Sequence, residues 1–282
     1  MASEAENEEA TRVVVETVFV AQGLEPIQLL QLDPLSYLRG CSGRGWLEDG
    51  TGLRVCCATL SLIRLLSRCR SLLTDKRVLE LGCGTGVVGL SLLRLAAPSV
   101  LVLTDGNPSA VDLTRANVER NASECSAVTC RRLLWSSRDD VELVREQYGA
   151  FDVIIGAELL YFNIVVSELV GVVLDLATPS GGVFLHSHLC RKEGQVAEIA
   201  LLFRERGWIT VQLNQGSLFE SSELNEQPSW TAVRTLVSGP ESAVKGFVRT
   251  SLAFDELTEA FLAAAEVEAR DGDANPFRAM QL

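Results

Sequence analysis

The sequence lacks the features that mark several classes of protein. It has no uninterrupted apolar run near the ~18 residues that a membrane-spanning helix needs, and its acidic first residues predict neither a signal peptide nor a transit peptide. A surplus of positive charge is also missing, because 25 Lys and Arg stand against 37 Asp and Glu, for a net charge of −12. A general binder of nucleic-acid phosphates needs the opposite balance. We therefore expect neither a membrane partner nor a nucleic-acid partner.

Metal-binding patterns are also missing. The chain has two histidines and eight cysteines, of which only Cys56 and Cys57 are close neighbours, and it has no Cys-x-x-Cys pair. Zinc sites and redox couples use such pairs, so we expect reduced thiols and no metal site. Reduced thiols predict a cytoplasmic protein, with the nucleus as a second location. Hydrophobic residues make up 47% of the chain, which is a globular composition, and we expect a monomer.

Composition along the 282 residues predicts four segments. Two apolar runs near the N-terminus, at 12–20 and 24–32, are typical of a β-hairpin, and a glycine-rich loop follows them. The expected segments are an acidic flexible tail (1–10), an N-terminal hairpin and loop extension (11–51), a main domain (52–270) and a C-terminal tail (271–282).

Strands and helices are expected to alternate through the main domain. Alternation at this spacing is typical of a parallel or mostly parallel doubly wound sheet, so the predicted fold class is α/β. The expected strands are 78–81, 99–105, 128–135, 151–157, 182–188, 208–213 and a last, antiparallel strand at 230–237. The expected helices are 56–70, 87–95, 109–121, 164–177, 195–206 and 252–269.

The turn after the first buried strand of this domain organises the rest. Glu80 lies on that strand, and Gly82, Gly84 and Gly86 follow at alternate positions before an apolar helix. Such a turn is where α/β sheets bind nucleotides, because glycine lets a ligand approach bare backbone and the helix offers free N–H groups. Residues 84–89 also satisfy the dinucleotide pattern G-x-G-x-x-G. This stretch alone leaves both NAD and S-adenosylmethionine (SAM) open.

A second acid follows at the end of the next strand. Asp105 lies nineteen residues past Gly86, close to the ~20-residue offset at which a strand-end carboxylate meets a ribose. Its alternative role is the N-cap of the helix 109–121. We expect the ribose role, which suits any adenosine ligand.

The end of the fourth strand carries another pair of candidate residues. Glu158 and Tyr161 follow the strand 151–157, at the edge where ligands of doubly wound sheets bind. An acid there can orient a lysine ammonium, and an aromatic ring can hold a cation or line a channel. A structural role is equally open, in which Glu158 caps the next helix and Tyr161 packs. His186 and His188, at the end of the fifth strand, could reach the same pocket or be structural.

With these residues in place, the sequence resembles the class I, seven-strand SAM-dependent methyltransferases, in the protein-lysine branch called methyltransferase family 16. The similarity covers about residues 52–237, and Asn117 and Asn121 also fit it. The segment Leu134–Trp135 looks like the pair whose aromatic ring covers the adenine. The cofactor-binding residues that the resemblance implies are Glu80, Gly82, Gly84, Gly86, Asp105, Trp135 and Ala157.

The same resemblance implies a function. The run from Glu158 to Tyr161 looks like the family's D-x-x-Y motif, with Glu in place of Asp, and it implies that these two residues are catalytic. Cys56 and Cys57 stand near the place where the family usually has a Trp-Pro pair. The implied protein is a Rossmann-like methyltransferase with an N-terminal hairpin extension, which uses SAM to methylate lysine in a non-histone protein substrate.

Three alternatives stand beside this reading. The acceptor could be another protein side chain or a small molecule. An NAD-dependent dehydrogenase, from a different class, would need a second nucleotide-binding half or a catalytic Tyr-x-x-x-Lys or His, and the sequence shows none with suitable context. A non-catalytic SAM-fold binding protein is the third alternative, and the intact glycine turn and Asp105 argue against it.

Overall fold

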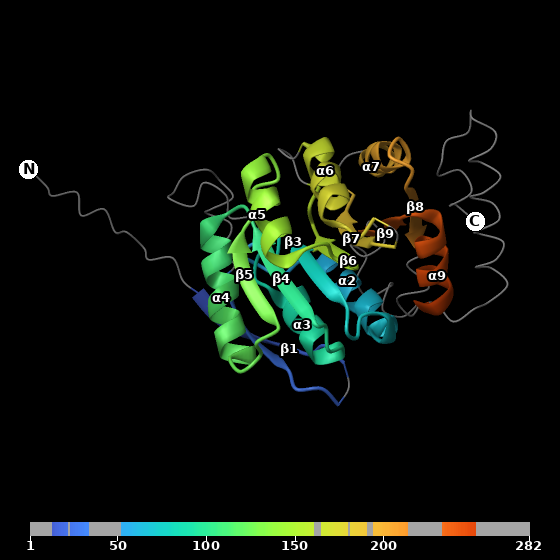
Figure 1. The fold of residues 1–282 in the computed structure, drawn as a ribbon. Coiled ribbons are helices and arrows are strands. Elements are labelled where there is room, and N and C mark those ends of the chain that lie inside the picture. The colour runs from blue at the N-terminus through green and yellow to red at the C-terminus, as the bar shows by residue number, and fades with distance from the viewer. Residues whose placement is uncertain are drawn as a thin grey trace, which may run out of the picture.

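The computed structural model describes most of the chain between residues 13 and 251. The described ranges are 13–21, 23–33, 52–160, 165–179, 181–190, 194–213 and 233–251. Within them the chain forms a seven-stranded sheet with helices on both faces and a separate two-stranded hairpin (Figure 1). The expected helix at 252–269 and both expected tails lie outside these ranges.

The large sheet has the strand order β5-β4-β3-β6-β7-β9-β8. β5, β4, β3, β6 and β7 are parallel neighbours, and β9 runs antiparallel to both β7 and β8. This confirms the mostly parallel, doubly wound sheet and its antiparallel last strand. The strands are β3 (Arg77–Leu81), β4 (Val100–Asp105), β5 (Val128–Arg132), β6 (Val153–Ala157), β7 (Val183–Leu189), β8 (Ile209–Leu213) and β9 (Val233–Gly239).

Because the chain winds outward in both directions from β3 and β6, the strand order reverses between them. In such sheets the crevice beyond the carboxyl ends of these two strands is the usual ligand site.

Two groups of helices cover the sheet. α5, α6 and α7 pack on one face, and α2, α3 and α9 pack on the other, as Figure 1 shows. The helices are α2 (Cys57–Arg68), the 3-10 turn η1 (Arg70–Leu72), α3 (Val87–Leu95), α4 (Pro108–Ala122), α5 (Arg138–Tyr148), α6 (Val166–Leu176), α7 (Gln195–Arg204) and α9 (Glu241–Ser251). Among the described residues, no helix is long and apolar enough to cross a membrane.

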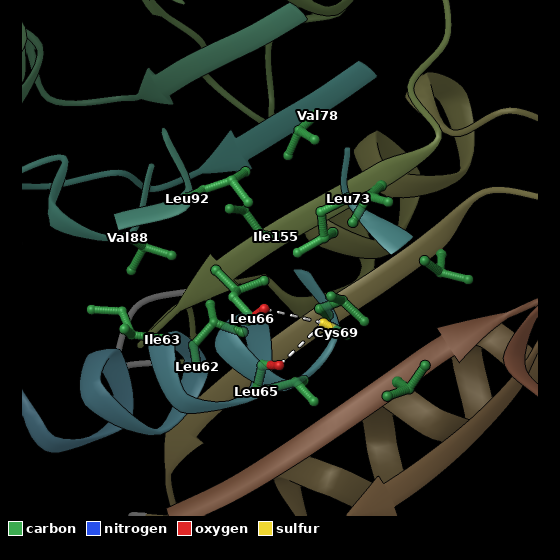
Figure 2. Packing of buried hydrophobic residues seen from close by; sticks show 14 of the residues in the cluster. Leu62, Ile63, Leu65, Leu66, Cys69, Leu73, Val78, Val88, Leu92 and Ile155 are labelled. Carbon is green, nitrogen blue, oxygen red and sulfur yellow. Dashed lines mark hydrogen bonds between the residues drawn. The ribbon is translucent and has the colours of Figure 1, made fainter. Parts of the chain in front are cut away.

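α2 packs its apolar face onto the centre of the sheet. Leu62, Leu65 and Leu66 are fully buried at helical spacing, and Figure 2 shows them gathered with Val78 of β3 and Ile155 of β6. Burying each of these leucines stabilises the fold by about 1.5–3 kcal/mol. This packing fixes the N-terminus of α2 beside the carboxyl ends of β6 and β7.

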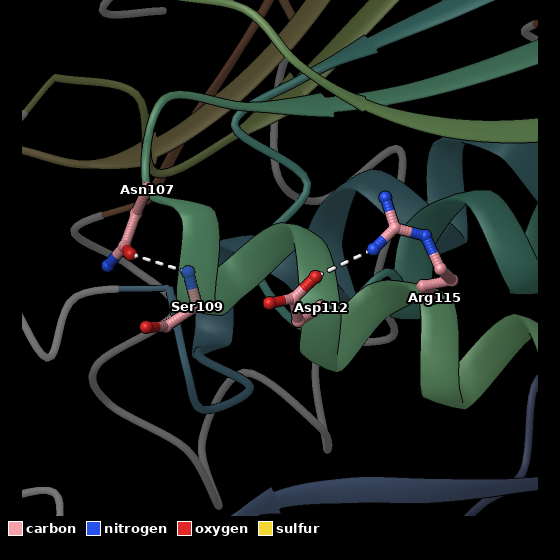
Figure 3. Close-up of polar contacts among 4 residues, drawn as sticks. All are labelled: Asn107, Ser109, Asp112 and Arg115. Carbon is pink, nitrogen blue, oxygen red and sulfur yellow. Dashed lines mark hydrogen bonds and ion pairs between the residues drawn. The ribbon is translucent and has the colours of Figure 1, made fainter.

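α4 begins with a well-defined cap. The Asn107 side chain accepts a hydrogen bond from the Ser109 N–H at 2.9 Å, and Pro108 occupies the first helical position (Figure 3). The alternative in which Asp105 caps this helix is therefore wrong. Farther along, Asp112 and Arg115 form an exposed ion pair at 2.6 Å, a contact that contributes only about 0.3–0.5 kcal/mol.

Two helices have no counterpart in the expectation from sequence. α5 begins at a Ser137 cap, whose hydroxyl accepts from the Asp140 N–H at 3.2 Å, and α9 follows Pro240 directly. Both starts are recognisable signals, since a Ser cap with acids in the first turn, or a proline before an amphipathic run, marks a helix N-terminus.

The N-terminal hairpin is confirmed. β1 (Val13–Val18) and β2 (Ile27–Leu32) pair antiparallel, with Val13 opposite Leu32. β2 faces the main domain, where Ile27 and Leu29 are fully buried, whereas Val13 and Val15 of β1 are about half exposed. The hairpin therefore rests on the main domain mainly through β2, and Val18 at the end of β1 also packs against the core.

His186 and His188 lie within β7, inside the expected strand 182–188, and both are fully buried. Their rings stack on one another with centroids 4.8 Å apart, and the ring of Phe184 stacks on His186 at 5.4 Å. Neither ring nitrogen of His186 meets a hydrogen-bond partner among the described residues. Burial, with the neighbouring His188, lowers the pKa of His186 well below its usual range, so this imidazole is neutral.

A neutral buried imidazole makes stability fall in acid. An unfolded histidine takes up a proton near pH 6.5, whereas the folded His186 does not, so its contribution is intact above that pH and is lost as pH falls. We expect the wild type to lose about 1.4 kcal/mol more per pH unit than His186→Leu below about pH 6.5. Urea denaturation at several pH values measures both curves, and parallel curves would contradict a neutral buried His186.

Candidate active site

The glycine loop, residues 82–86, joins β3 to α3 at the switch point. Gly82, Gly84 and Gly86 all have positive φ angles, of 58°, 54° and 76°. A Cβ added to Gly84 would lie 2.3 Å from the carbonyl oxygen of Gly52. Position 84 therefore requires glycine for two reasons, its left-handed backbone and the close approach of a second chain segment.

Asp105 ends β4 and fixes the loop from one side. Its Oδ2 accepts a hydrogen bond from the Gly84 N–H at 3.0 Å, and its Oδ1 accepts from the Asn107 N–H at 2.9 Å. Each carboxylate oxygen can accept two hydrogen bonds. The half-buried carboxylate thus holds the loop, and its contact with ribose hydroxyls stays a prediction.

Glu80 lies beneath the loop rather than at its surface. The residue is 1% exposed, and its Oε2 accepts from the Gly89 N–H in the first turn of α3 at 2.9 Å. Burial, with the nearby Asp105 charge, raises the pKa of Glu80 to about 8. The contact that the structure gives it ties α3 to β3, and direct contact with a cofactor stays a prediction.

Two side chains of α4 hold the loop's carbonyl groups. Thr114 Oγ1 donates to the Gly84 carbonyl at 2.7 Å, and Asn117 Nδ2 donates to the Thr85 carbonyl at 2.9 Å. Both side chains are fully buried. Neither role was predicted from the sequence, apart from the fit of Asn117 to the family resemblance. Polar residues recurring on the inward face of a helix are the signal that could have found them.

Trp135 and Leu159 bring two further strand ends to the loop. A Cβ added to Gly82 would lie 3.9 Å from Trp135 Cζ2 and 2.6 Å from Leu159 Cδ2. Trp135 follows β5, and Leu159 follows Ala157, the last residue of β6. The structure thus gathers the predicted Gly82, Gly84, Asp105 and Trp135 around one loop, together with Gly52, which the sequence analysis missed.

Glu158 holds a strained position between the ends of β6 and β7. Its φ angle is +58°, a left-handed conformation that costs a non-glycine residue about 1–2 kcal/mol. Its N–H donates to the Ser187 carbonyl at 2.8 Å, and its Oε1 accepts from the Leu189 N–H at 2.6 Å. Such strain clusters at functional sites.

The capping alternative for Glu158 is wrong, because α6 begins after Val165 and has no side-chain cap. Tyr161 lies outside the described residues, so its catalytic role stays a prediction.

The start of α2 lies near Glu158. Cys56 occupies its N-cap position, and its Sγ lies 3.1 Å from Thr59 Oγ1. Burial, with the Glu158 charge as a second cause, raises the pKa of Cys56 to about 11. The thiol is therefore neutral at physiological pH. In the part of the chain that the structure describes, no group of three or more His, Cys, Asp or Glu could hold a metal ion.

The fold and the glycine loop together define the class of protein. A seven-stranded sheet with an antiparallel β9, a glycine loop after β3 and an acid ending β4 is the Rossmann-like class I methyltransferase fold. A protein of Streptococcus mutans assigned as a SAM-dependent methyltransferase shares this fold, with a TM-score of 0.53 and 14% identity over 82% of this chain and 56% of that one.

The family is more specific. A family model described as lysine methyltransferase matches residues 47–201, more than half of the 282 residues. The chain belongs to this lysine methyltransferase family. The matched stretch includes the glycine loop, Asp105, Trp135 and Glu158, and membership in this family overturns the dehydrogenase alternative.

Two named relatives agree with the family. The protein-lysine N-methyltransferase EEF2KMT of Homo sapiens is 30% identical over 175 residues, which are 58% of this chain and 48% of that protein. The calmodulin-lysine N-methyltransferase of Arabidopsis thaliana is 33% identical over 90 residues, 31% of this chain and 28% of that protein. The chain thus matches less than half of the length of each relative.

Glu80 makes stability depend on pH in the opposite direction to His186. The unfolded carboxyl loses its proton near pH 4.5 and the folded one near pH 8, so stability is greatest in acid and falls as pH rises between these values.

We expect Glu80→Gln to remove this dependence while keeping an oxygen that accepts from Gly89. Relative to the variant, the wild type should lose about 1.4 kcal/mol per pH unit through that window. Urea denaturation of the two proteins from acid to neutral pH measures the difference, and an equal slope for both would show that Glu80 ionises normally.

Proposed function

We propose that this protein is a SAM-dependent protein-lysine N-methyltransferase that acts on a non-histone protein. The observation that carries the proposal is the family match over residues 47–201, because that stretch contains both the glycine loop and Glu158. The names of the two relatives support a protein substrate. The cytoplasmic location and the monomeric state stay predictions.

The residues around the loop suit a SAM molecule. In the proposed site, Asp105 accepts from the ribose hydroxyls and Trp135 covers the adenine. The backbone of the glycine loop, with its carbonyl groups already bonded by α4, lies against the methionine end. When bound, SAM supplies an electrophilic methyl group on a sulfonium.

Glu158 is the proposed acceptor-side residue. A lysine amine has a pKa of ~10.4, so it arrives mainly as an ammonium and must become neutral before it can attack. The carboxylate attracts and orients this group, and the Leu189 N–H fixes the direction of that carboxylate. The neutral Cys56 thiol nearby adds no competing charge. We also propose that Tyr161, which lies outside the described residues, lines the channel by which the substrate lysine reaches the methyl group.

Labelled SAM and a cell extract test the proposal. We expect the wild type to label a protein, and acid hydrolysis of that protein to release labelled methyl-lysine. Glu158→Gln removes the charge at nearly constant size, so transfer should fall about 100-fold or more while SAM binding changes little. Gly84→Ala places a methyl group against Gly52 and should lose both binding and transfer.

Glu119→Gln is the matched control, because Glu119 is an exposed residue of α4 and its change should alter neither quantity. Tight SAM binding without any labelled protein would exclude a protein substrate. A label released on an amino acid other than lysine would show that the enzyme methylates another protein side chain.

A further inference from the structure

The second edge of β2 is completed by side chains rather than by another strand. β2 pairs with β1 along one edge. On the other edge the Gln28 N–H donates to Asn121 Oδ1 at 2.8 Å, and the Leu30 N–H donates to Asn117 Oδ1 at 2.6 Å. These alternate N–H groups would otherwise be an open strand edge.

Each asparagine also returns a hydrogen bond to the same residue. Asn121 Nδ2 donates to the Gln28 carbonyl at 3.0 Å, and Asn117 Nδ2 donates to the Leu30 carbonyl at 2.9 Å. A side-chain amide carries the donor and acceptor of a peptide group. Four residues of helix rise ~6 Å, close to the ~6.6 Å of two residues of strand. Two side chains of α4 therefore make the hydrogen bonds to β2 that a third strand would make.

Asn117 differs from Asn121 in one respect. Its Nδ2 also donates to the Thr85 carbonyl of the glycine loop at 2.9 Å, whereas the remaining bond of Asn121 goes to the backbone of α4 itself, at Asn117 O. One fully buried amide thus joins the hairpin to the loop that lies between β3 and α3.

A second connection runs through the segment after residue 51. The Leu32 N–H donates to the Leu53 carbonyl at 3.0 Å, and the Val55 N–H donates to Gln31 Oε1 at 3.1 Å. This segment begins at Gly52, whose backbone lies against Gly84. β2 therefore supports the glycine loop from two directions.

We propose that the N-terminal hairpin is part of the cofactor site, and that Asn117 is the positioning residue through which the hairpin acts. The inference rests on the proposed binding of SAM at this loop. The seated hairpin fixes the amide plane of Asn117, the amide fixes the Thr85 carbonyl, and the loop is held ready for its ligand. A loop without this support must be ordered by the cofactor, which weakens affinity.

Asn117→Asp and Asn121→Asp form a matched pair for the test. Each keeps an oxygen for the β2 N–H and loses the amide donor, but only Asn117→Asp turns an oxygen toward the Thr85 carbonyl. We expect S-adenosylhomocysteine, measured by titration calorimetry well below the unfolding temperature, to bind Asn117→Asp about 10-fold more weakly than the wild type. Asn121→Asp should stay within about twofold.

Substitutions on the hairpin separate this effect from damage to α4. Leu30→Pro removes the N–H that meets Asn117, and Gln28→Pro removes the one that meets Asn121. Both N–H groups point away from β1, so the pairing of the hairpin survives. We expect about a 3- to 10-fold loss of affinity for Leu30→Pro and a smaller loss for Gln28→Pro. Unchanged affinity in Leu30→Pro, or equal losses in the two asparagine variants, would overturn the proposal.

Amide hydrogen exchange, measured without any ligand, tests the coupling of hairpin and loop independently of the proposed function. Amides of residues 82–89 should exchange faster in Asn117→Asp and Leu30→Pro than in their partner variants. Faster exchange without any binding of S-adenosylhomocysteine by the wild type would refute the cofactor and keep the coupling of hairpin and loop. Unchanged exchange in both variants would refute the coupling itself.

Discussion

The hydrogen bonds that hold the backbone of the glycine loop are the interactions on which the site depends. A loop with three alternate glycines has much conformational freedom, and its polar groups need partners wherever water is excluded. Asp105, Thr114 and Asn117 supply these partners from β4 and α4, and Glu80 anchors the helix that follows. Because β4 and α4 both lie beside the glycine loop, the fold itself brings these side chains within hydrogen-bonding distance of the loop.

On the proposed acceptor side of the site, the described residues include two neutral groups and the carboxyl group of Glu158. Cys56 is a neutral thiol, and His186 is a neutral imidazole buried in β7. Backbone groups of β7 hold Glu158, because its Oε1 accepts from the Leu189 N–H and its own N–H donates to the Ser187 carbonyl. A carboxylate among neutral groups favours the binding of a positively charged substrate group. Selection among such groups then depends on the shape of the site and on the desolvation of the charged group.

The sequence predicted the parts that local patterns encode. Helix α3 matches its expected bounds, and Asp105 and Trp135 lie beside the loop as the strand order required. The burial of Glu80 could not be predicted from the sequence. An acid on a strand before a glycine turn has the same local pattern whether its side chain faces a ligand or a helix. The pairing of β2 with α4 was also hidden, because its partners lie 87 and 93 residues apart. Helix α5 was not predicted although its Ser137 cap is regular, and helix α9 lies between the expected strand 230–237 and the expected helix 252–269.

The long separation between β2 and its amide partners has a consequence for the order of synthesis. The hairpin leaves the ribosome before α4, because Asn117 and Asn121 follow their partners in β2 by 87 and 93 residues, a delay of several seconds at about 5–20 residues per second. During that interval the apolar face of β2, with Ile27 and Leu29, has no surface to cover it. The hairpin is therefore made well before the helix that completes its edge, and a chaperone would bind β2 most readily during that interval.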